Sequence, residues 1–304
     1  MLTRDDVVAA RATLAGRLPH TPLLTSRALG ARLKCDLFQR TGSFKARGAL
    51  NKLSLLTPAE RERGVITVSA GNHAQAVAWA AAETNTSALV VMSAGASQQK
   101  IDATRAYGAT LDLEATTMSE AFDRLAQLVE ETGRVLVHPH EDPLVLAGAG
   151  TIGLEVEEDA PDADAILVAV GGGGLIAGIQ AAVGANVRVI AVEPELSPAF
   201  HAAVDAGGPV SLEPSSIADG CNAPRLGRLP YELCRDLERV LVSEAEIEDA
   251  FRFLYARAKL AVEPAGAVAT AALLTHKVEA ERPVVVVSGG NVATQIASGI
   301  LVSR

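Results

Sequence analysis

The segment from Gln39 to Ala49, QRTGSFKARGA, places one lysine where covalent chemistry could occur. Lys45 follows a Gly-Ser turn and an aromatic ring, and the residues after it predict a helix over about 44–55. A lysine amine attacks carbonyl carbon only when it is deprotonated, and its ordinary pKa is about 10.4. A desolvated site would lower this pKa, whereas a helix surface would leave a solvated charge. This segment alone allows both interpretations of Lys45.

Two loops lie where a predicted strand leads into a predicted helix. One is SAGNH, residues 69–73, and the other is the glycine run 171–174, which Leu175 follows. At a helix start, free backbone N–H groups and the positive end of the helix dipole bind anions. Glycine lets an anion approach the backbone closely. Two such sites in one cleft would suit ligands that carry a phosphate and a carboxylate.

The glycine run has two other interpretations. Gly172-x-Gly174-x-x-Ala177 fits the G-x-G-x-x-G/A dinucleotide fingerprint, and Glu193 lies about 20 residues further on, where an acid would hold a ribose hydroxyl. That pattern would indicate a nicotinamide-dependent oxidoreductase. The run could also be a tight turn that serves packing alone. The motif by itself leaves phosphate binding, dinucleotide binding and packing open.

The other polar motifs favour structural roles. The segment HPHED, residues 138–142, holds a proline turn after a predicted strand, and no second His or Cys group stands near it in sequence, so no metal site is predicted. Ser288, in SGGN, lacks the G-x-S-x-G pattern of a nucleophilic serine and any obvious base. Both motifs are therefore predicted to be turns.

Short apolar runs alternate with helical patterns along the chain. This order predicts an α/β fold with two lobes, mostly parallel sheets flanked by helices, and a cleft at the carboxyl ends of the strands. The expected strands are 65–68, 88–92, 110–113, 135–137, 165–170, 187–192, 240–242 and 284–287. The expected helices are 4–16, 26–33, 44–55, 72–83, 97–107, 119–131, 147–158, 175–183, 195–206, 244–258 and 266–276. Residues 207–230 are expected to be irregular.

Composition excludes several classes of function. The chain of 304 residues is 49% hydrophobic and 3% aromatic with a net charge of -9, which predicts an aliphatic core. An acidic chain without a basic run argues against nucleic acid and anionic membrane partners. The cysteines are odd in number and widely spaced, as expected of buried thiols in a reducing compartment. No signal peptide or membrane span is evident, so a cytoplasmic location is expected.

Taken together, the motifs resemble those of the fold type II pyridoxal-phosphate enzymes, in the threonine/serine dehydratase and serine racemase branch. The TGSFKARGA segment at 41–49 is similar to the family's cofactor-lysine motif, and SAGNHAQ at 69–75 to its asparagine loop. Further matches are GAGTIGLE at 148–155, the glycine run with Leu175, ADG at 218–220, EPAGA at 263–267 and SGGN at 288–291. They run in order from about residue 20 to the end.

The resemblance implies a role for each motif. Lys45 would form a Schiff base with pyridoxal 5'-phosphate and later take the α-proton, with Phe44 packed against the cofactor ring. Asn72 would bond the ring hydroxyl, and Ser288 would meet the pyridine nitrogen without forcing a proton onto it. Gly171, Gly172, Gly173, Gly174 and Leu175 would hold the phosphate. The loop Ser69, Ala70, Gly71, Asn72 and His73 would bind the substrate, with Ser69 also counted as catalytic.

Three departures from the family pattern bear on function. Ala70 stands where racemases carry a second serine, which favours elimination over racemisation because a methyl group carries no proton. Ala199 stands where metal-binding members carry an acid six residues after Glu193, so no metal is predicted. Leu226-Gly227 replaces the usual Pro-Gly. A C-terminal amino-acid-sensing domain is expected to be missing, as in catabolic dehydratases.

The resemblance therefore predicts a lyase that converts a β-hydroxy amino acid, L-threonine or L-serine, into a 2-oxo acid and ammonia. Serine racemisation, dehydration of hydroxyaspartate with Arg225 as its basic partner, a nicotinamide oxidoreductase and a non-catalytic ligand-binding module remain alternatives. The substrate would be a small amino acid, and the family suggests a homodimer. A large cofactor domain is expected over 1–53 and 142–304, and a small mobile domain over 54–141.

Overall fold

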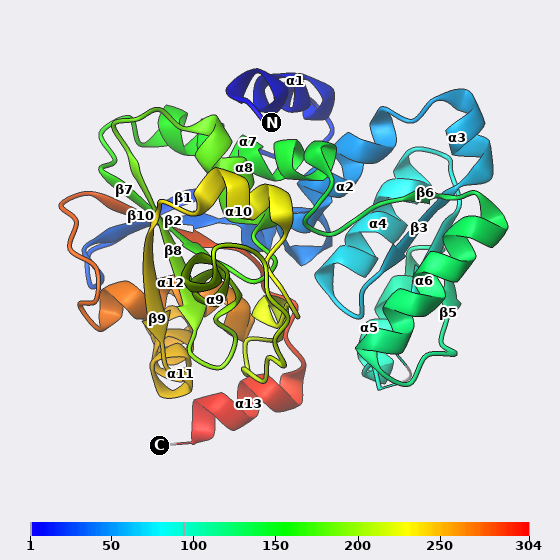
Figure 1. Cartoon of the computed structure of the whole chain (residues 1–304). Helices are drawn as coiled ribbons and strands as arrows, with labels where there is room; N and C mark the ends of the chain where they lie inside the picture. Colours follow the sequence, from blue (N-terminus) through cyan, green and yellow to red (C-terminus); the bar gives the residue numbers. More distant parts are fainter. Residues whose placement is uncertain (1, 94, 304) are drawn as a thin grey trace.

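The computed structural model describes residues 2–93 and 95–303. It contains two separate sheets, with the helix that carries Lys45 between them (Figure 1). The larger sheet has the strand order β1-β2-β10-β7-β8-β9, and only the β1–β2 pair is antiparallel. Its strands are β1 (Leu23–Ser26), β2 (Ala31–Cys35), β7 (Ala165–Ala169), β8 (Arg188–Pro194), β9 (Glu238–Val242) and β10 (Pro283–Val287).

The central strands of this sheet are buried on both faces, as their unbroken apolar sequences require. In β10, Val285 and Val287 pack into one core while Val284 and Val286 pack into the other, because successive side chains of a strand point to opposite faces. One face is covered by α11 (Glu244–Phe253), α12 (Pro264–Leu274) and α13 (Thr294–Val302). The other is covered by α7 (Pro143–Asp159), α8 (Gly174–Ala182), α9 (Ala199–Ala206) and α10 (Arg228–Cys234).

The smaller sheet is parallel throughout and has the order β5-β4-β3-β6. Its strands are β3 (Val65–Val68), β4 (Ala88–Val91), β5 (Thr110–Asp112) and β6 (Val135–Leu136). The helices of this part are α3 (Pro58–Arg63), α4 (Asn72–Glu83), α5 (Gln98–Ala106) and α6 (Met118–Thr132). Helix α6 packs on one face through Leu125 and Leu128, while α4 packs on the other through Val77 and Ala80.

Helices α1 (Arg4–Leu14) and α2 (Lys45–Ser54) complete the order of elements. The apolar face of α2, with Ala49, Leu50 and Leu53, packs in the same core as residues of α4 and Val145 of α7. Helix α2 thus contacts helices of both sheets, and its first residue is Lys45. The chain between β2 and α2 runs through two short 3-10 turns, Asp36–Phe38 and Arg40–Gly42.

Two expectations about local structure are wrong. The helix expected over 26–33 is instead a β-hairpin, in which Leu24 of β1 pairs with Leu33 of β2 and Gly30 takes a positive φ of 68° in the connection. Pairing of β2 with the buried strand β10 overrides the local helical pattern of this segment. The stretch expected to be irregular ends in helix α10, which starts at Arg228 and carries Pro230 in its first turn, where proline is tolerated.

The fold class expected from the sequence is confirmed: the architecture is α/β, with mostly parallel sheets flanked by helices. All three cysteines are buried and unpaired. None of the helices within residues 2–93 and 95–303 combines the length and apolar character needed to cross a bilayer.

Candidate active site

A cavity of about 370 Å³ opens between the carboxyl ends of strands from the two sheets. Its walls come from the start of α2, the loops after β3, β7 and β10, and the segment after η3 (Asp219–Cys221). Every site residue expected from the sequence lines it: Phe44, Lys45, Ser69, Ala70, Gly71, Asn72, His73, Gly171, Gly172, Gly173, Gly174, Leu175 and Ser288. The structure thus brings together residues from opposite ends of the chain.

Lys45 reaches this cavity from the first turn of α2. Its Nζ donates to the carbonyl oxygen of Pro139 at 3.1 Å and lies 5.0 Å from the centroid of the Phe44 ring. Desolvation lowers the pKa of Lys45 to about 8, and the nearby Cys221 acts weakly in the opposite direction. More of this amine is therefore neutral, and so nucleophilic, near physiological pH than of an exposed lysine.

The segment before Lys45 is fixed by the loop after β10. Phe44 N donates to Ser288 O at 3.0 Å, and Gly290 N donates to Gly42 O at 2.9 Å. Gly42 has a φ of 73°, and a Cβ atom there would clash with the side chain of Asn291. The lysine motif needs glycine at this position both for the left-handed backbone and for the close approach of Asn291.

Asn72 is held in one orientation by hydrogen bonds at both ends of its amide. Its Nδ2 donates to Glu263 Oε1 at 2.7 Å, and its Oδ1 accepts from Asn291 Nδ2 at 2.8 Å. Asn291 Nδ2 also donates to Thr41 O at 2.6 Å. These contacts leave one N–H of Asn72 for a ligand in the cavity.

Glu263 is a site residue to which the sequence assigned no role, although its EPAGA segment matched the family. It is buried, with 4% of its surface exposed. Burial raises its pKa to about 8, with a smaller contribution from Asp219, while the bond to Asn72 and the charge of Lys100 act in the opposite direction. A protonated Glu263 still accepts the Asn72 hydrogen bond through its carbonyl oxygen.

The proton on Glu263 predicts a specific dependence of stability on pH. Because its pKa is raised on folding, the folded protein retains this proton up to pH about 8, whereas the unfolded chain releases it near 4.5. The free energy of unfolding of the wild type, relative to Glu263→Gln, should therefore fall as pH rises from about 4.5 to 8. Urea unfolding of both proteins across this range measures the difference. Glu195→Gln, at an exposed position, controls for the loss of a carboxylate. A difference that does not vary with pH contradicts the prediction.

The glycine run lines the cavity and packs directly against His140 of the HPHED segment. Gly173 has a φ of 87° and precedes α8, and no side chain caps this helix end. A Cβ atom at Gly171 would lie 2.8 Å from Cys221 O, and one at Gly172 would clash with the ring of His140. The first-turn N–H groups of α8 lack partners within the helix and are available to an anion.

Three histidines near Lys45 are kept neutral. Burial lowers the pKa of His73 to about 3, and burial also lowers the pKa values of His138 and His140. His138 Nδ1 accepts the backbone N–H groups of His140 and Glu141, so this segment is the polar turn that the sequence favoured. His73 Nε2 contacts Val137 O at 3.0 Å, while its buried Nδ1 has no hydrogen-bond partner among the described residues.

Other charged groups of the site lie on helices and loops that flank the two sheets. Lys100 of α5 forms an ion pair with Asp219 of η3, and both residues line the cavity. Arg225, the basic residue considered for an acidic substrate, is exposed and is not one of the described residues that line the cavity.

Buried Glu193 accepts bonds from Phe200 N, His201 N and His201 Nδ1, so it binds the first turn of α9. No group of three or more candidate metal ligands occurs in the described part of the chain.

The donor set fits pyridoxal phosphate. An amine with a lowered pKa can condense with an aldehyde, an uncapped glycine-flanked helix end can hold a phosphate, and the neutral hydroxyl of Ser288 can face a pyridine nitrogen.

Comparisons with known proteins agree with this chemistry. A family model described as "Pyridoxal-phosphate dependent enzyme" matches residues 16–290. The catabolic L-threonine dehydratase TdcB of Escherichia coli K12 is 41% identical over 95% of this chain and 92% of its own. Maize serine racemase superposes with a TM-score of 0.93 at 33% identity, covering 98% of this chain and 96% of its own. A threonine deaminase from tomato, Solanum lycopersicum, gives a TM-score of 0.90 at 33% identity, covering 98% of this chain and 86% of its own.

Proposed function

The chain belongs to the family of pyridoxal-phosphate dependent enzymes, and from this premise we propose that it dehydrates and deaminates L-threonine or L-serine. The products are a 2-oxo acid and ammonia. One observation carries the proposal: Lys45, whose pKa is lowered to about 8, lines the same cavity as the glycine run and Ser288. The threonine dehydratase and deaminase relatives support this choice of substrate.

When bound, pyridoxal phosphate supplies an electron sink for the negative charge that develops at the substrate Cα. Lys45 would hold the cofactor covalently and would also be the base that takes the α-proton of the substrate. A lysine whose pKa is near the working pH suits a general base. Ser288, which lines the cavity, would offer the pyridine nitrogen a neutral hydroxyl, and the electron sink would then be milder than with a carboxylate partner. Elimination needs charge at Cα only briefly.

The remaining cavity residues hold the cofactor and the substrate. Gly171 to Gly174 and Leu175, at the start of α8, would bind the phosphate, and Phe44 would pack against the ring. Asn72, whose amide is fixed by Glu263 and Asn291, would donate its remaining N–H to the ring hydroxyl. Residues 69–73, in the loop that leads into α4, would bind the substrate carboxylate, with Ser69 also a candidate catalytic residue. We assign the glycine run to phosphate binding because membership of this family accounts for both the glycine run and Lys45. Dinucleotide binding would leave Lys45 without a role.

Two alternatives of the same chemical type remain. Serine racemisation is favoured by the likeness to serine racemase structures and disfavoured by Ala70, which offers no second acid. Dehydration of hydroxyaspartate would need a cation for the extra carboxylate. The cavity cation Lys100 is already paired with Asp219, and Arg225 is exposed outside the lining. The cavity therefore favours a neutral β-hydroxy side chain.

Substrate preference is tested by measuring 2-oxo acid release from L-threonine, L-serine and 3-hydroxyaspartate side by side. We expect turnover of threonine and serine, and kcat/KM at least about tenfold lower for 3-hydroxyaspartate, because its second carboxylate would be desolvated without a free cation. Arg225→Ala should leave all three rates within about twofold, as for an exposed surface position. A preference for 3-hydroxyaspartate that is lost in Arg225→Ala would instead establish the acidic substrate.

We also propose that the protein is a cytoplasmic homodimer. The exposed apolar side chains of Phe38, Ile296 and Val302 offer surface for a second copy, and the three unpaired, buried thiols suit a reducing compartment. The division into domains 1–53 with 142–304 and 54–141 stays a prediction, supported by the two separate sheets. Sedimentation of the purified protein tests the dimer, since a single species of 31.4 kDa would contradict it.

A further inference from the structure

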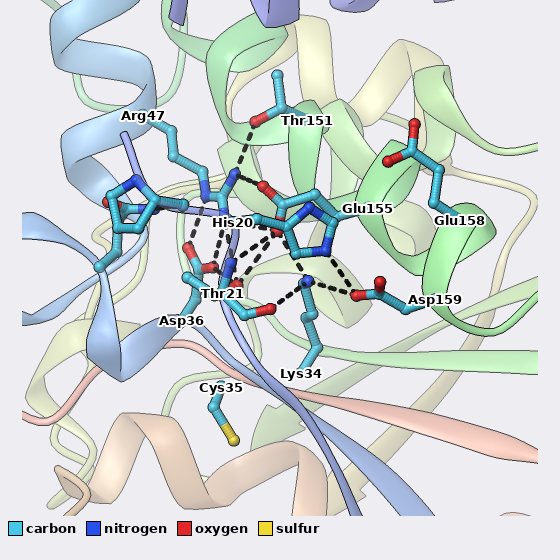
Figure 2. A network of polar contacts seen from close by, with 12 residues as sticks. His20, Thr21, Lys34, Cys35, Asp36, Arg47, Thr151, Glu155, Glu158 and Asp159 are labelled. Carbon is cyan, nitrogen blue, oxygen red and sulfur yellow. Dashed lines mark hydrogen bonds and ion pairs between the residues drawn. The ribbon is translucent and has the colours of Figure 1, made fainter. Parts of the chain in front are cut away.

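Arg47 lies two positions after Lys45 on α2, and its side chain is buried among acids. Only 2% of its surface is exposed. Its guanidinium binds Asp36 through Nε–Oδ2 at 2.9 Å and Nη2–Oδ1 at 2.7 Å. It binds Glu155 through Nη1–Oε1 at 2.5 Å and Nη2–Oε2 at 3.0 Å. Figure 2 shows this fork between the two carboxylates.

The network around Arg47 extends to a second buried cation. Lys34, which is fully buried, donates to Thr21 O at 2.7 Å and pairs with Glu155 at 2.8 Å and Asp159 at 3.0 Å (Figure 2). Burial alone would raise the pKa of Glu155, but the hydrogen bond and charge of Arg47, with the charge of Lys34, lower it to about 2. Glu155 therefore stays ionised at neutral pH and remains an acceptor for both cations.

The two cations differ in the elements that they hold. Lys34 lies on β2 and binds α7, so it connects the large sheet to its own covering helix. Arg47 lies in the first turn of α2 and binds both Asp36, the residue that follows β2, and α7. Of the two, Arg47 alone acts on the helix that presents Lys45.

Helix α7 is also the spacer between Lys45 and the glycine run. Its Gly148 lies against α2, where a Cβ atom would come within 2.5 Å of Arg47 O. Its Gly150 lies against α8, where a Cβ atom would come within 2.5 Å of Gly178 O. Helix α8 begins directly after Gly173. Backbone-to-backbone contacts thus run from the lysine helix through α7 to the helix whose first turn forms the anion site.

We propose that Arg47 is a positioning residue, whose double fork to Asp36 and Glu155 fixes α2 on α7 and so sets the position of Lys45 relative to Gly171–Gly174. The proposal rests on the role of Lys45 as cofactor anchor. Apolar packing often replaces a buried ion pair without loss of stability, because desolvation offsets the attraction between the charges. What apolar packing lacks is the directional geometry of a guanidinium that binds two carboxylates at once.

The test compares Arg47→Met with Lys34→Met, a matched control that removes the other buried cation of the same network. The first measurement is the Kd of each cofactor-free protein for pyridoxal 5'-phosphate, with the unfolding midpoint measured in parallel. The second is the pH dependence of Lys45 acylation in the cofactor-free protein, followed by peptide mass spectrometry. Neither measurement uses threonine or serine turnover, so failure of the dehydratase assignment leaves both interpretable.

Loss of a residue that positions a binding group commonly lowers affinity or activity about 10- to 100-fold. We therefore expect Arg47→Met to raise the Kd for pyridoxal 5'-phosphate at least about tenfold more than Lys34→Met does. The pH midpoint of Lys45 acylation should move in Arg47→Met and stay unchanged in Lys34→Met. Equal changes in the two variants, or no change in either, overturn the proposal. If Arg47→Met does not fold, Arg47→Lys decides: a Kd raised about threefold or more supports the role of the fork, and an unchanged Kd overturns it.

Discussion

Lys45→Ala is expected to abolish the absorption band at about 410 nm that a lysine-bound pyridoxal phosphate gives. Turnover of threonine and serine should fall at least about 10⁴-fold, because the variant loses the cofactor anchor and the α-proton base together. Absorption spectra of the purified protein with added pyridoxal phosphate, and a continuous assay of 2-oxo acid release, measure the two effects. The cavity should still bind the phosphate, since the glycine run is unchanged.

Lys52→Ala is the matched control for this experiment. Lys52 lies on the same helix but pairs with Asp142 at 3.0 Å and is not among the described residues that line the cavity. Its replacement should keep the absorption band, with turnover within about twofold of the wild type, as for other changes away from a site. Survival of the band in Lys45→Ala, or wild-type protein that retains NAD in its place, would contradict the assignment of Lys45.

The local signals of the site were readable in the sequence because each spans a few adjacent residues. The lysine motif, the SAGNH loop and the glycine run each join one element to the next, and parallel strands place such loops at one edge of a sheet. The β-hairpin at 23–35 was not readable, because β2 pairs not only with β1 but also with β10, which lies about 250 residues further along. Long-range pairing decides strand formation where local propensity is ambiguous.

The supporting contacts were the least predictable part of the site. The bond between Asn72 and Glu263 joins residues 191 positions apart, and Arg47 meets Glu155 across 108 positions. The sequence assigned Arg47 no role of its own within the lysine motif, and only the structure shows that the helix face it occupies is buried. Charged residues are rarely buried unless paired, so a single sequence gives no reason to expect two buried cations here.

Ala70→Ser is expected to create racemisation. Ala70 lines the cavity in the loop before α4, whereas Lys45 enters it from α2, so the two positions reach a bound ligand from different elements. The resemblance places a serine with acid/base function at position 70 in racemases, and a positioned acid or base contributes about 10²- to 10⁴-fold. Formation of D-serine from L-serine should therefore rise at least about 10²-fold relative to elimination.

Chiral chromatography of serine after incubation, with deuterium exchange at Cα in D₂O, measures this change. Ala70→Gly is the matched control, because it alters the same small side chain without adding a hydroxyl group, and it should keep the wild-type ratio of racemisation to elimination. Equal D-serine formation in Ala70→Ser and Ala70→Gly would show that the added hydroxyl is not responsible and would contradict the prediction. Absence of D-serine in both would mean that the missing hydroxyl is not what directs Lys45 chemistry toward elimination, and that the cavity restricts proton return to one face by shape alone.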